Sequence, residues 1–466
     1  MSGLASTVLA LAVALAAFVW LYRRERTHGG VVSVYFVLGL VVVEAAVYPS
    51  PDTIPVGLFH PGGGSLSFRL VDVLVPLALL ARLLARGFPQ RVETAALCWL
   101  AFLFWLGVAT VEGLLSGNPA GLVAFEAKAI VYLAVFILAA GVPLAEYVDG
   151  RRFERFVYAT SALAAVLVFT DQANVRIDSD IAILPLRELG AVGADAATLF
   201  GTIGVVAATV GACRVERRMP LLLASTPLLV SVAAATQRAA LLGAAVAVGV
   251  LLVLFLLAPR HVHTTPTELA LAACAATGVL LLPYVAGAAL GRQAPSVPLA
   301  RSVATAISSE EKHLSSEARV AQLRAVRGLI AERPIFGWGL GKTYSYYDPG
   351  PREFVDTKLT HNIAADLLLR AGVVGLVLFV VALTVAFSGG IRTWFADGVD
   401  PPVLGFAVGA VATLAGLLAK GMVESLFEKY RLAVLMGMLA GVLLSAATAR
   451  VRVHREAPVA ARYVLH

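Results

Sequence analysis

A histidine and an asparagine stand directly before a long apolar segment, in the stretch KLTHNIAADLLLRAGVVGLVLF that begins at Lys358. The imidazole of His361 titrates near neutral pH, so at the mouth of a membrane span it can exchange a proton with a polar group. Accepting the proton of an attacking hydroxyl is one such reaction. A single histidine is more often structural, and that alternative stays open here. Asn362 is expected to cap the following helix or to orient the ring.

Arginines at two places have the chemistry to bind a phosphate. Arg238 lies in a very short turn between apolar runs, in AAATQRAALLGAAVAV, where a guanidinium needs an anionic partner. A carboxylate such as Glu424 or Asp195 would serve. A phosphate would also serve, because the planar fork of arginine binds it with paired hydrogen bonds. Arg319 lies in the polar stretch SSEARVAQLRAVRGLIAERP.

This polar stretch is predicted to be a helix. Ser315 or Ser316 is the expected N-cap, and Pro334 closes the segment. One face would be apolar and the other basic, with Val320, Leu323, Val326 and Ile330 against Arg319, Arg324 and Arg327. The alternative to phosphate binding is an amphipathic helix that lies on anionic lipid headgroups.

Glycines follow this helix in IFGWGLGKT. The ending GKT is typical of a phosphate loop, but position 336, where that loop needs glycine, is Phe. We therefore expect the glycines to allow tight turns near the membrane surface, with aromatic side chains at the interface. These residues are Gly337, Gly339 and Gly341, then Trp338, Tyr344, Tyr346 and Tyr347.

Other charged residues within apolar segments are expected to neutralise one another. The expected pairs are Asp366 with Arg370, Lys420 with Glu424, Arg69 with Asp72, and Glu126 with Lys128. Lys420 and Glu424 lie near the outer end of their span and could line the same cavity as His361.

Together these residues suit a substrate that is half lipid and half polar, with an anionic linkage between the halves. A polyprenyl pyrophosphate that carries a sugar fits this description. Arginines would hold the diphosphate and stabilise the charge that develops as it leaves, while His361 takes the proton of a sugar hydroxyl. The sequence has no cluster with metal-ligand spacing, so we expect a reaction without metal or another cofactor.

The rest of the chain must position these residues in a membrane. Of the 466 residues, 59% are hydrophobic and 14% are charged, whereas soluble proteins carry roughly one quarter charged residues. We expect an all-α polytopic membrane protein with about 12–13 transmembrane helices. The approximate limits of the spans are 3–21, 31–48, 66–85, 93–113, 120–140, 153–170, 192–213, 220–235, 239–258, 267–290, 362–387, 401–424 and 431–449.

The arginines in alternate connections predict the orientation. The connections that are richer in arginine include YRRERTH, DGRRFER, CRVERRM and the tail ARVRVHRE. They are expected to face the cytoplasm, which places the C-terminus inside and, for an odd number of spans, the N-terminus outside. Most of the net charge of +7 is explained in this way, and a nucleic-acid role is not indicated. The expected regions are 1–290 with the first ten spans, a large extracytoplasmic loop at 291–361, and 362–466 with the last three spans and a cytoplasmic tail.

Three local patterns resemble the O-antigen ligase / O-antigen polymerase superfamily of polytopic bacterial glycosyltransferases. They are TQRAALLGAAVAV, EARVAQLRAVRGLIAERPIFGWGLG and THNIAADLLLRAGVVGLVLF. Their order and the large loop between them also agree, so that the resemblance covers roughly 190–450 well and the first half by span count alone. Gln237 stands where serine is commoner, and about thirteen spans compare with the family's usual twelve or so.

The resemblance implies a fold related to the type C glycosyltransferases and work at the outer face of the bacterial cytoplasmic membrane, without metal or nucleotide. It implies that His361 activates the acceptor hydroxyl, and that Arg238 and Arg319 bind the pyrophosphate of an undecaprenyl-pyrophosphate-linked glycan. The candidate supporting residues are Asn362, Gly337, Gly339, Lys420 and Glu424. The acceptor would be a glycan, a lipid or a protein.

The resemblance favours a ligase, and four alternatives remain. A polymerase would join lipid-linked repeats, and an oligosaccharyltransferase would act on protein. A lipid or glycan flippase would use the same bundle for transport, although we find no internal repeat of the kind that transporters show. A structural partner in an envelope complex would tolerate replacement of His361, Arg238 and Arg319.

Overall fold

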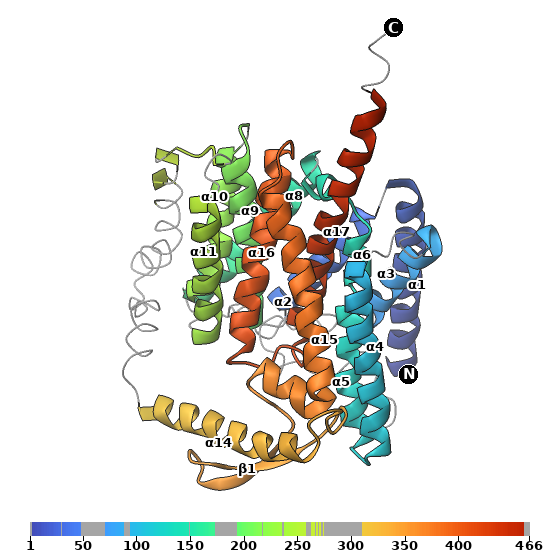
Figure 1. Ribbon diagram of the computed structural model, residues 1–466, viewed down its shortest axis with the longest axis vertical. Helices are drawn as coiled ribbons and strands as arrows, with labels where there is room; N and C mark the ends of the chain where they lie inside the picture. The colour runs from blue at the N-terminus through green and yellow to red at the C-terminus, as the bar shows by residue number, and fades with distance from the viewer. Residues whose placement is uncertain are drawn as a thin grey trace.

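The computed structural model describes residues 2–28, 30–47, 70–87, 94–148, 150–172, 193–216, 218–234, 237–257 and 310–460, with a few residues between 262 and 274. In these ranges the chain is a bundle of helices with a smaller layer across one end (Figure 1). The elements are α1 (Ser2–His28), α2 (Val31–Val47), α3 (Leu70–Arg86), α4 (Thr94–Leu115), α5 (Ala120–Leu133), α6 (Phe136–Ala140), α7 (Leu144–Val148), α8 (Gly150–Gln172), α9 (Ala194–Cys213), α10 (Arg218–Ala234), α11 (Arg238–Leu257), α14 (Glu310–Glu332), β1 (Tyr344–Asp348), β2 (Glu353–Thr357), α15 (Ile363–Trp394), α16 (Pro401–Gly421) and α17 (Tyr430–Ala460).

Among the described residues, seven helices are long and apolar enough to cross a membrane, and shorter apolar helices lie at Val31–Ala46, Arg218–Ala234 and Tyr430–Ala446. The expected all-α polytopic membrane fold is confirmed. The predicted span 120–140 is divided between α5 and α6, and α17 packs at the division, where a Cβ on Gly437 would lie 2.7 Å from the Leu133 carbonyl oxygen. The predicted span 267–290 lies almost entirely outside the described residues, so the total number of spans stays a prediction.

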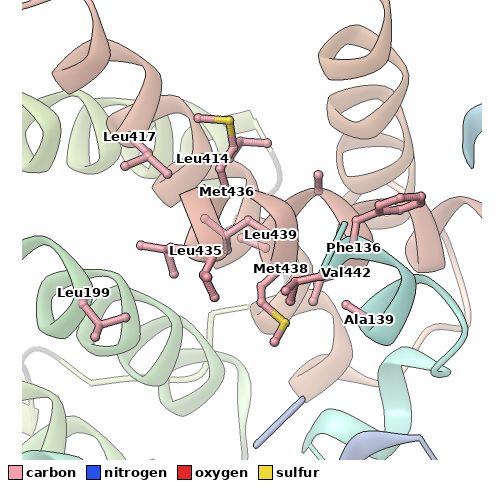
Figure 2. Packing of buried hydrophobic residues seen from close by; sticks show 14 of the residues in the cluster. Phe136, Ala139, Leu199, Leu414, Leu417, Leu435, Met436, Met438, Leu439 and Val442 are labelled. Carbon is pink, nitrogen blue, oxygen red and sulfur yellow. The ribbon is translucent and has the colours of Figure 1, made fainter. Parts of the chain in front are cut away.

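Buried aliphatic side chains hold the bundle together around α17. Figure 2 shows side chains of α17 packed with those of α6, α9 and α16, labelled as Leu435, Met436, Met438, Leu439 and Val442, then Phe136, Ala139, Leu199, Leu414 and Leu417. Helices α11 and α16 approach closely, since a Cβ on Gly243 would lie 2.8 Å from the carbonyl oxygen of Gly416. Such contacts of small residues are typical of helices packed in a membrane.

The layer across the end of the bundle consists of α14 and a β-hairpin (Figure 1). β1 and β2 pair antiparallel, from Tyr344 opposite Thr357 to Asp348 opposite Glu353. Alternate residues of a strand face opposite sides, so that Tyr344 and Tyr346 are buried with Val326 of α14, whereas Tyr347 is exposed. The hairpin was not predicted. The sequence analysis placed these tyrosines at the membrane interface, whereas Tyr344 and Tyr346 are buried against α14.

The helix predicted before Pro334 is confirmed as α14, but its start was wrong. α14 begins at Glu310, so Ser315 and Ser316 lie inside the helix and neither is its N-cap. The predicted apolar face is also only partly correct. Val326 is fully buried, whereas Val320 is 47% and Leu323 41% exposed.

Helix α15 is broken at Gly372, where the backbone has φ 66° instead of a helical value. The glycine-rich segment after α14 fits into this break, and the N–H of Gly339 donates a hydrogen bond to the Arg370 carbonyl at 3.0 Å. Backbone groups at membrane depth need protein partners, because no water reaches them. The predicted tight turns are confirmed, since Gly337 and Gly339 both have φ 76°.

Replacing Gly339 with alanine is therefore expected to destabilise the protein. The left-handed backbone costs a residue with a Cβ about 1–2 kcal/mol, and this Cβ would overlap the backbone of Gly113. Gly328 on α14 is the matched control, because a Cβ there meets nothing within 4 Å and alanine favours a helix. Thermal unfolding in detergent should show a lower midpoint for Gly339→Ala and an unchanged or higher one for Gly328→Ala. An unchanged midpoint for Gly339→Ala would contradict this packing.

Arg370, two residues before the break in α15, is the centre of a buried ionic cluster. It pairs with Asp366 at 3.1 Å, with Glu126 at 2.9 Å and with Glu428 at 3.3 Å. The predicted pair of Asp366 and Arg370 is confirmed. Arg370 also donates a hydrogen bond to the Lys358 carbonyl at 2.7 Å, which ties the segment before His361 to the bundle.

The predicted pair of Glu126 and Lys128 is wrong. Residues two apart point to different sides of a helix, so Glu126 faces Arg370 while Lys128 binds Asp72 at 2.7 Å. Arg69, the predicted partner of Asp72, lies outside the described residues.

Candidate active site

His361 lies at the end of the bundle that α14 covers, directly before α15. Asn362 is the N-cap of α15, since its Oδ1 accepts a hydrogen bond from the Ala365 N–H at 2.9 Å. Its Nδ2 donates to the Met422 carbonyl at 3.1 Å, which ties the cap to the end of α16. The capping role predicted for Asn362 is confirmed.

Gln322 of α14 orients the ring of His361. Its Oε1 lies 2.8 Å from the ring nitrogen Nδ1, and Gln322 is only 4% exposed. The sequence analysis missed Gln322. A usable signal was present, because Gln322 follows Arg319 by three residues and therefore lies beside it on the helix surface.

The charges around His361 set its protonation state. Burial lowers the pKa of His361 below its ordinary value of 6.5, and the positive charge of Arg319 lowers this pKa further. Lys429 acts on the pKa in the same direction as Arg319, and Glu424 acts in the opposite direction. The imidazole is therefore neutral at neutral pH, which is the form that can accept a proton.

Lys420, Lys429, Asp195 and Glu424 form an ionic cluster beside His361. The predicted pair of Lys420 and Glu424 is confirmed at 3.3 Å, and Lys420 lies 3.7 Å from Asp195. Lys429 pairs with Asp195 at 3.2 Å and also with Glu424. Both carboxylates considered as partners of Arg238 therefore pair with lysines.

An apolar cavity of about 300 Å³ lies among α9, α10, α11 and α16, next to this cluster. Lys420 reaches it, and its Nζ donates a hydrogen bond to the Thr198 hydroxyl at 2.7 Å. The remaining wall is largely aliphatic and includes Leu229, Val232, Ala240, Ala244, Val248 and Leu417. The cavity thus joins a lipid-like interior to a cationic group.

Arg238 is the first residue of α11, and its side chain lies outside the described part of the structure. Its place in the chain is close to the cavity, because Ala240 lines it together with Lys420. The role of Arg238 as a phosphate ligand stays a prediction.

The structure gathers several predicted site residues at one end of the bundle, namely His361, Arg319, Asn362, Lys420 and Glu424. Gly337 and Gly339 lie apart from the ring, where they fit the loop into the break of α15. Arg319, Arg324 and Arg327 are all exposed on α14, and Arg319 is the α14 cation that acts on His361. The arrangement can take a proton from a hydroxyl that is bound beside an anion.

Among the described residues, no group of three or more His, Cys, Asp or Glu side chains could hold a metal ion. Glu126, Asp366 and Glu428 surround Arg370 instead, and this arginine supplies their counter-charge. The expectation of a reaction without metal stays a prediction.

Comparison with protein families finds a match to this part of the chain. Residues 196–380 match a family model described as O-antigen ligase. The matched range runs from α9 through the first half of α15 and contains Arg238, Arg319 and His361. No curated protein sequence is similar enough to the chain to match it.

Proposed function

Since residues 196–380 place this integral membrane protein in the O-antigen ligase superfamily, we propose that it transfers a glycan from a polyprenyl-pyrophosphate carrier to an acceptor hydroxyl. Membership of the family supports glycan transfer of the ligase or polymerase type in general. The carrier, the roles of individual residues and independence from metal belong to the proposal.

The observation that carries the proposal is the position of His361 directly before α15, with its ring 2.8 Å from Gln322 and its pKa lowered by burial and by the positive charge of Arg319. A general base must be unprotonated at working pH, and a cation beside it can hold the anionic leaving group. A site that only bound an anion would gain nothing from a histidine whose pKa is lowered.

The proposed reaction is a displacement at the anomeric carbon of the donor sugar. His361 takes the proton of the acceptor hydroxyl while that oxygen bonds to the anomeric carbon. The bond between this carbon and the diphosphate oxygen breaks, and undecaprenyl pyrophosphate leaves with the electron pair. Arg238 and Arg319 stabilise the negative charge that grows on the diphosphate.

The apolar cavity supports a donor with an isoprenoid tail. The first part of the tail would lie against the aliphatic wall among α10, α11 and α16, and the diphosphate would lie toward Lys420 and the start of α11. Asp195 and Glu424 are both paired with lysines, so a phosphate is the partner that we propose for Arg238. Glu424 and Lys420 would then support the site by balancing its charge.

We place this end of the protein at the outer face of the cytoplasmic membrane. α14 and the hairpin lie at the end of the bundle opposite the C-terminal part of α17 (Figure 1). The basic connection around Arg214 and Arg218 and the basic C-terminal segment favour the cytoplasm by the positive-inside rule. The C-terminus would therefore be cytoplasmic and the region 291–361 external.

Transfer is expected to fall as the pH drops through the pKa of His361. Because burial and Arg319 lower that pKa, the loss should set in below pH 6.5. Arg319→Gln removes a positive charge that opposes protonation, so the acid limb of the rate profile should move to higher pH. Glu424→Gln removes a negative charge that favours protonation and should move it to lower pH. Rate profiles for the wild type and both variants test this, and three coincident acid limbs would exclude His361 as the titrating group.

The experiment that tests the function uses purified protein in lipid nanodiscs with an undecaprenyl-pyrophosphate-linked glycan and candidate acceptors. Mass spectrometry should find glycan bonded to an acceptor, with one undecaprenyl pyrophosphate released for each bond formed. A chelator should leave the rate unchanged. A single transferred chain indicates a ligase, and a ladder of repeats indicates the polymerase alternative. Lipid-linked glycan that crosses a liposome membrane uncleaved, with no product in nanodiscs, would point to a flippase instead.

A further inference from the structure

We propose that Gln322, together with two residues of the β-hairpin, fixes the proton of neutral His361 on Nδ1 and leaves the lone pair on Nε2. The hairpin residues are Tyr346 and Asp348. The catalytic consequence rests on the function proposed above, whereas the position of the proton is a property of the ring that can be measured without turnover. Gln322 is in this sense a positioning residue for the base.

The direction of the hydrogen bonds is set first at Asp348, the last residue of β1. Its Oδ1 accepts a hydrogen bond from the Gly350 N–H at 2.9 Å, and its Oδ2 lies 3.1 Å from the hydroxyl oxygen of Tyr346. An ionised carboxylate has no proton to give. The hydroxyl of Tyr346 must therefore be the donor to Asp348.

This donation decides which way the amide of Gln322 points. The single proton of the Tyr346 hydroxyl is used toward Asp348, so the phenolic oxygen can only accept from Gln322. Gln322 hydrogen-bonds to this hydroxyl, and its amide oxygen Oε1 lies 2.8 Å from Nδ1 of His361. The NH₂ end of the amide thus faces Tyr346, and the carbonyl oxygen Oε1 is left for His361.

The amide oxygen then decides the tautomer of the histidine. Oε1 lies 2.8 Å from Nδ1 and can only accept, so Nδ1 must carry the proton. A neutral imidazole has one proton, and therefore Nε2 is the nitrogen with the free electron pair. Gln322 and Tyr346 are 4% and 9% exposed, so water competes little for these groups.

The chain of hydrogen bonds links the surface layer to the site. Gln322 belongs to α14 and Tyr346 to β1, while His361 precedes the first turn of α15. Correct docking of α14 on the hairpin is thereby a condition for a correctly protonated base. The ring nitrogen that acts on the acceptor hydroxyl is assigned as Nε2.

The tautomer can be measured directly in the full-length protein. Nitrogen chemical shifts of isotope-labelled histidine separate protonated from unprotonated ring nitrogens, and the His361 signals are those missing in His361→Gln. At neutral pH the wild type should show a protonated Nδ1 and an unprotonated Nε2. A proton on Nε2 in the wild type would overturn the proposal.

Variants connect the tautomer to the rate. Gln322→Leu should lower kcat about 10- to 100-fold with KM for the donor changed less than about twofold, because the tautomer is no longer held. Tyr346→Phe removes the hydroxyl that accepts from Gln322, so that the Gln322 amide can rotate. This variant should lower kcat by a smaller factor and should show a mixture of the two His361 tautomers. Gln322→Glu keeps an acceptor for Nδ1–H, so it should retain kcat near the wild-type value and move the acid limb to higher pH. Tyr347→Phe, on the same strand with an exposed side chain, is the matched control and should change nothing.

The readouts separate this proposal from the proposed function. If His361 carries its proton on Nδ1 but the protein transfers no glycan, the tautomer is supported and the proposed function is refuted. If the protein transfers glycan while His361 carries its proton on Nε2, the proposed function is supported and the tautomer is refuted. Equal losses of kcat in Gln322→Leu and Gln322→Glu, with the wild-type tautomer kept in both, would overturn the positioning role.

Discussion

Replacing His361 with alanine is expected to slow glycan transfer by about 100- to 10,000-fold, the range that a general base contributes. The acceptor hydroxyl is a poor nucleophile until its proton is taken, and His361 is the neutral base held at this end of the bundle. Donor binding should change little, since the proposed diphosphate ligands and the apolar cavity remain. The initial rate of product formation and the binding of labelled donor should be measured on the same preparation.

The variant also leaves Gln322 without its partner, so that folding has to be checked. Size-exclusion profiles and thermal midpoints in detergent serve this purpose, with Tyr347→Phe carried through the same steps as a control. A well-folded His361→Ala protein that transfers within about tenfold of the wild-type rate would remove the proton acceptor from the proposed mechanism.

Replacing Arg319 with alanine is expected to weaken donor binding by about 10- to 100-fold. Hydrogen bonds to a charged group contribute about 1.5–3 kcal/mol, and Arg319 is the α14 cation that acts on His361. Arg319→Lys should recover part of the affinity, because lysine keeps the charge but lacks the planar fork of donors. Titration of nanodisc-bound protein with labelled donor measures the change.

Arg324→Ala and Arg327→Ala are the matched controls for Arg319→Ala. All three arginines are exposed on the same helix, so each variant removes one positive charge from the exposed surface of α14. Equal losses of affinity in the three variants would mean that α14 attracts anionic lipid in general. A loss confined to Arg319→Ala supports a specific diphosphate site.

Features that depend on neighbouring residues could be predicted from the sequence. The spans follow from runs of apolar residues, and nearly all of them coincide with a helix wherever the structure describes them. The cap at Asn362 and the pairs Asp366–Arg370 and Lys420–Glu424 follow from the spacing of one helical turn. The tight turns at the glycines follow from their freedom to adopt positive φ.

Features that depend on which helices meet could not be predicted in this way. Lys128 pairs with Asp72 on another helix, and Glu126 pairs with Arg370, because side chains two residues apart point to different sides of a helix. Knowing these partners requires the packing of α3, α5 and α15. The position of Gln322 beside His361 likewise depends on how α14 docks.

The hairpin did leave a signal in the sequence. The stretches YSYYD and EFVDT are short, rich in aromatic or β-branched residues, and separated by the turn residues PGPR. Read as two strands, they would have placed Tyr344 and Tyr346 on one face. Their packing against α14, which positions Gln322, would still have required the tertiary structure.

The most direct test of the proposed function compares undecaprenyl pyrophosphate release by the wild type and by His361→Ala from the same lipid-linked glycan, with and without acceptor. The wild type should release the carrier rapidly when acceptor is present, and His361→Ala should release it at least about 100-fold more slowly. Equal release from both proteins would contradict the role of His361. With donor and acceptor verified as present, no release from either protein would contradict glycan transfer itself.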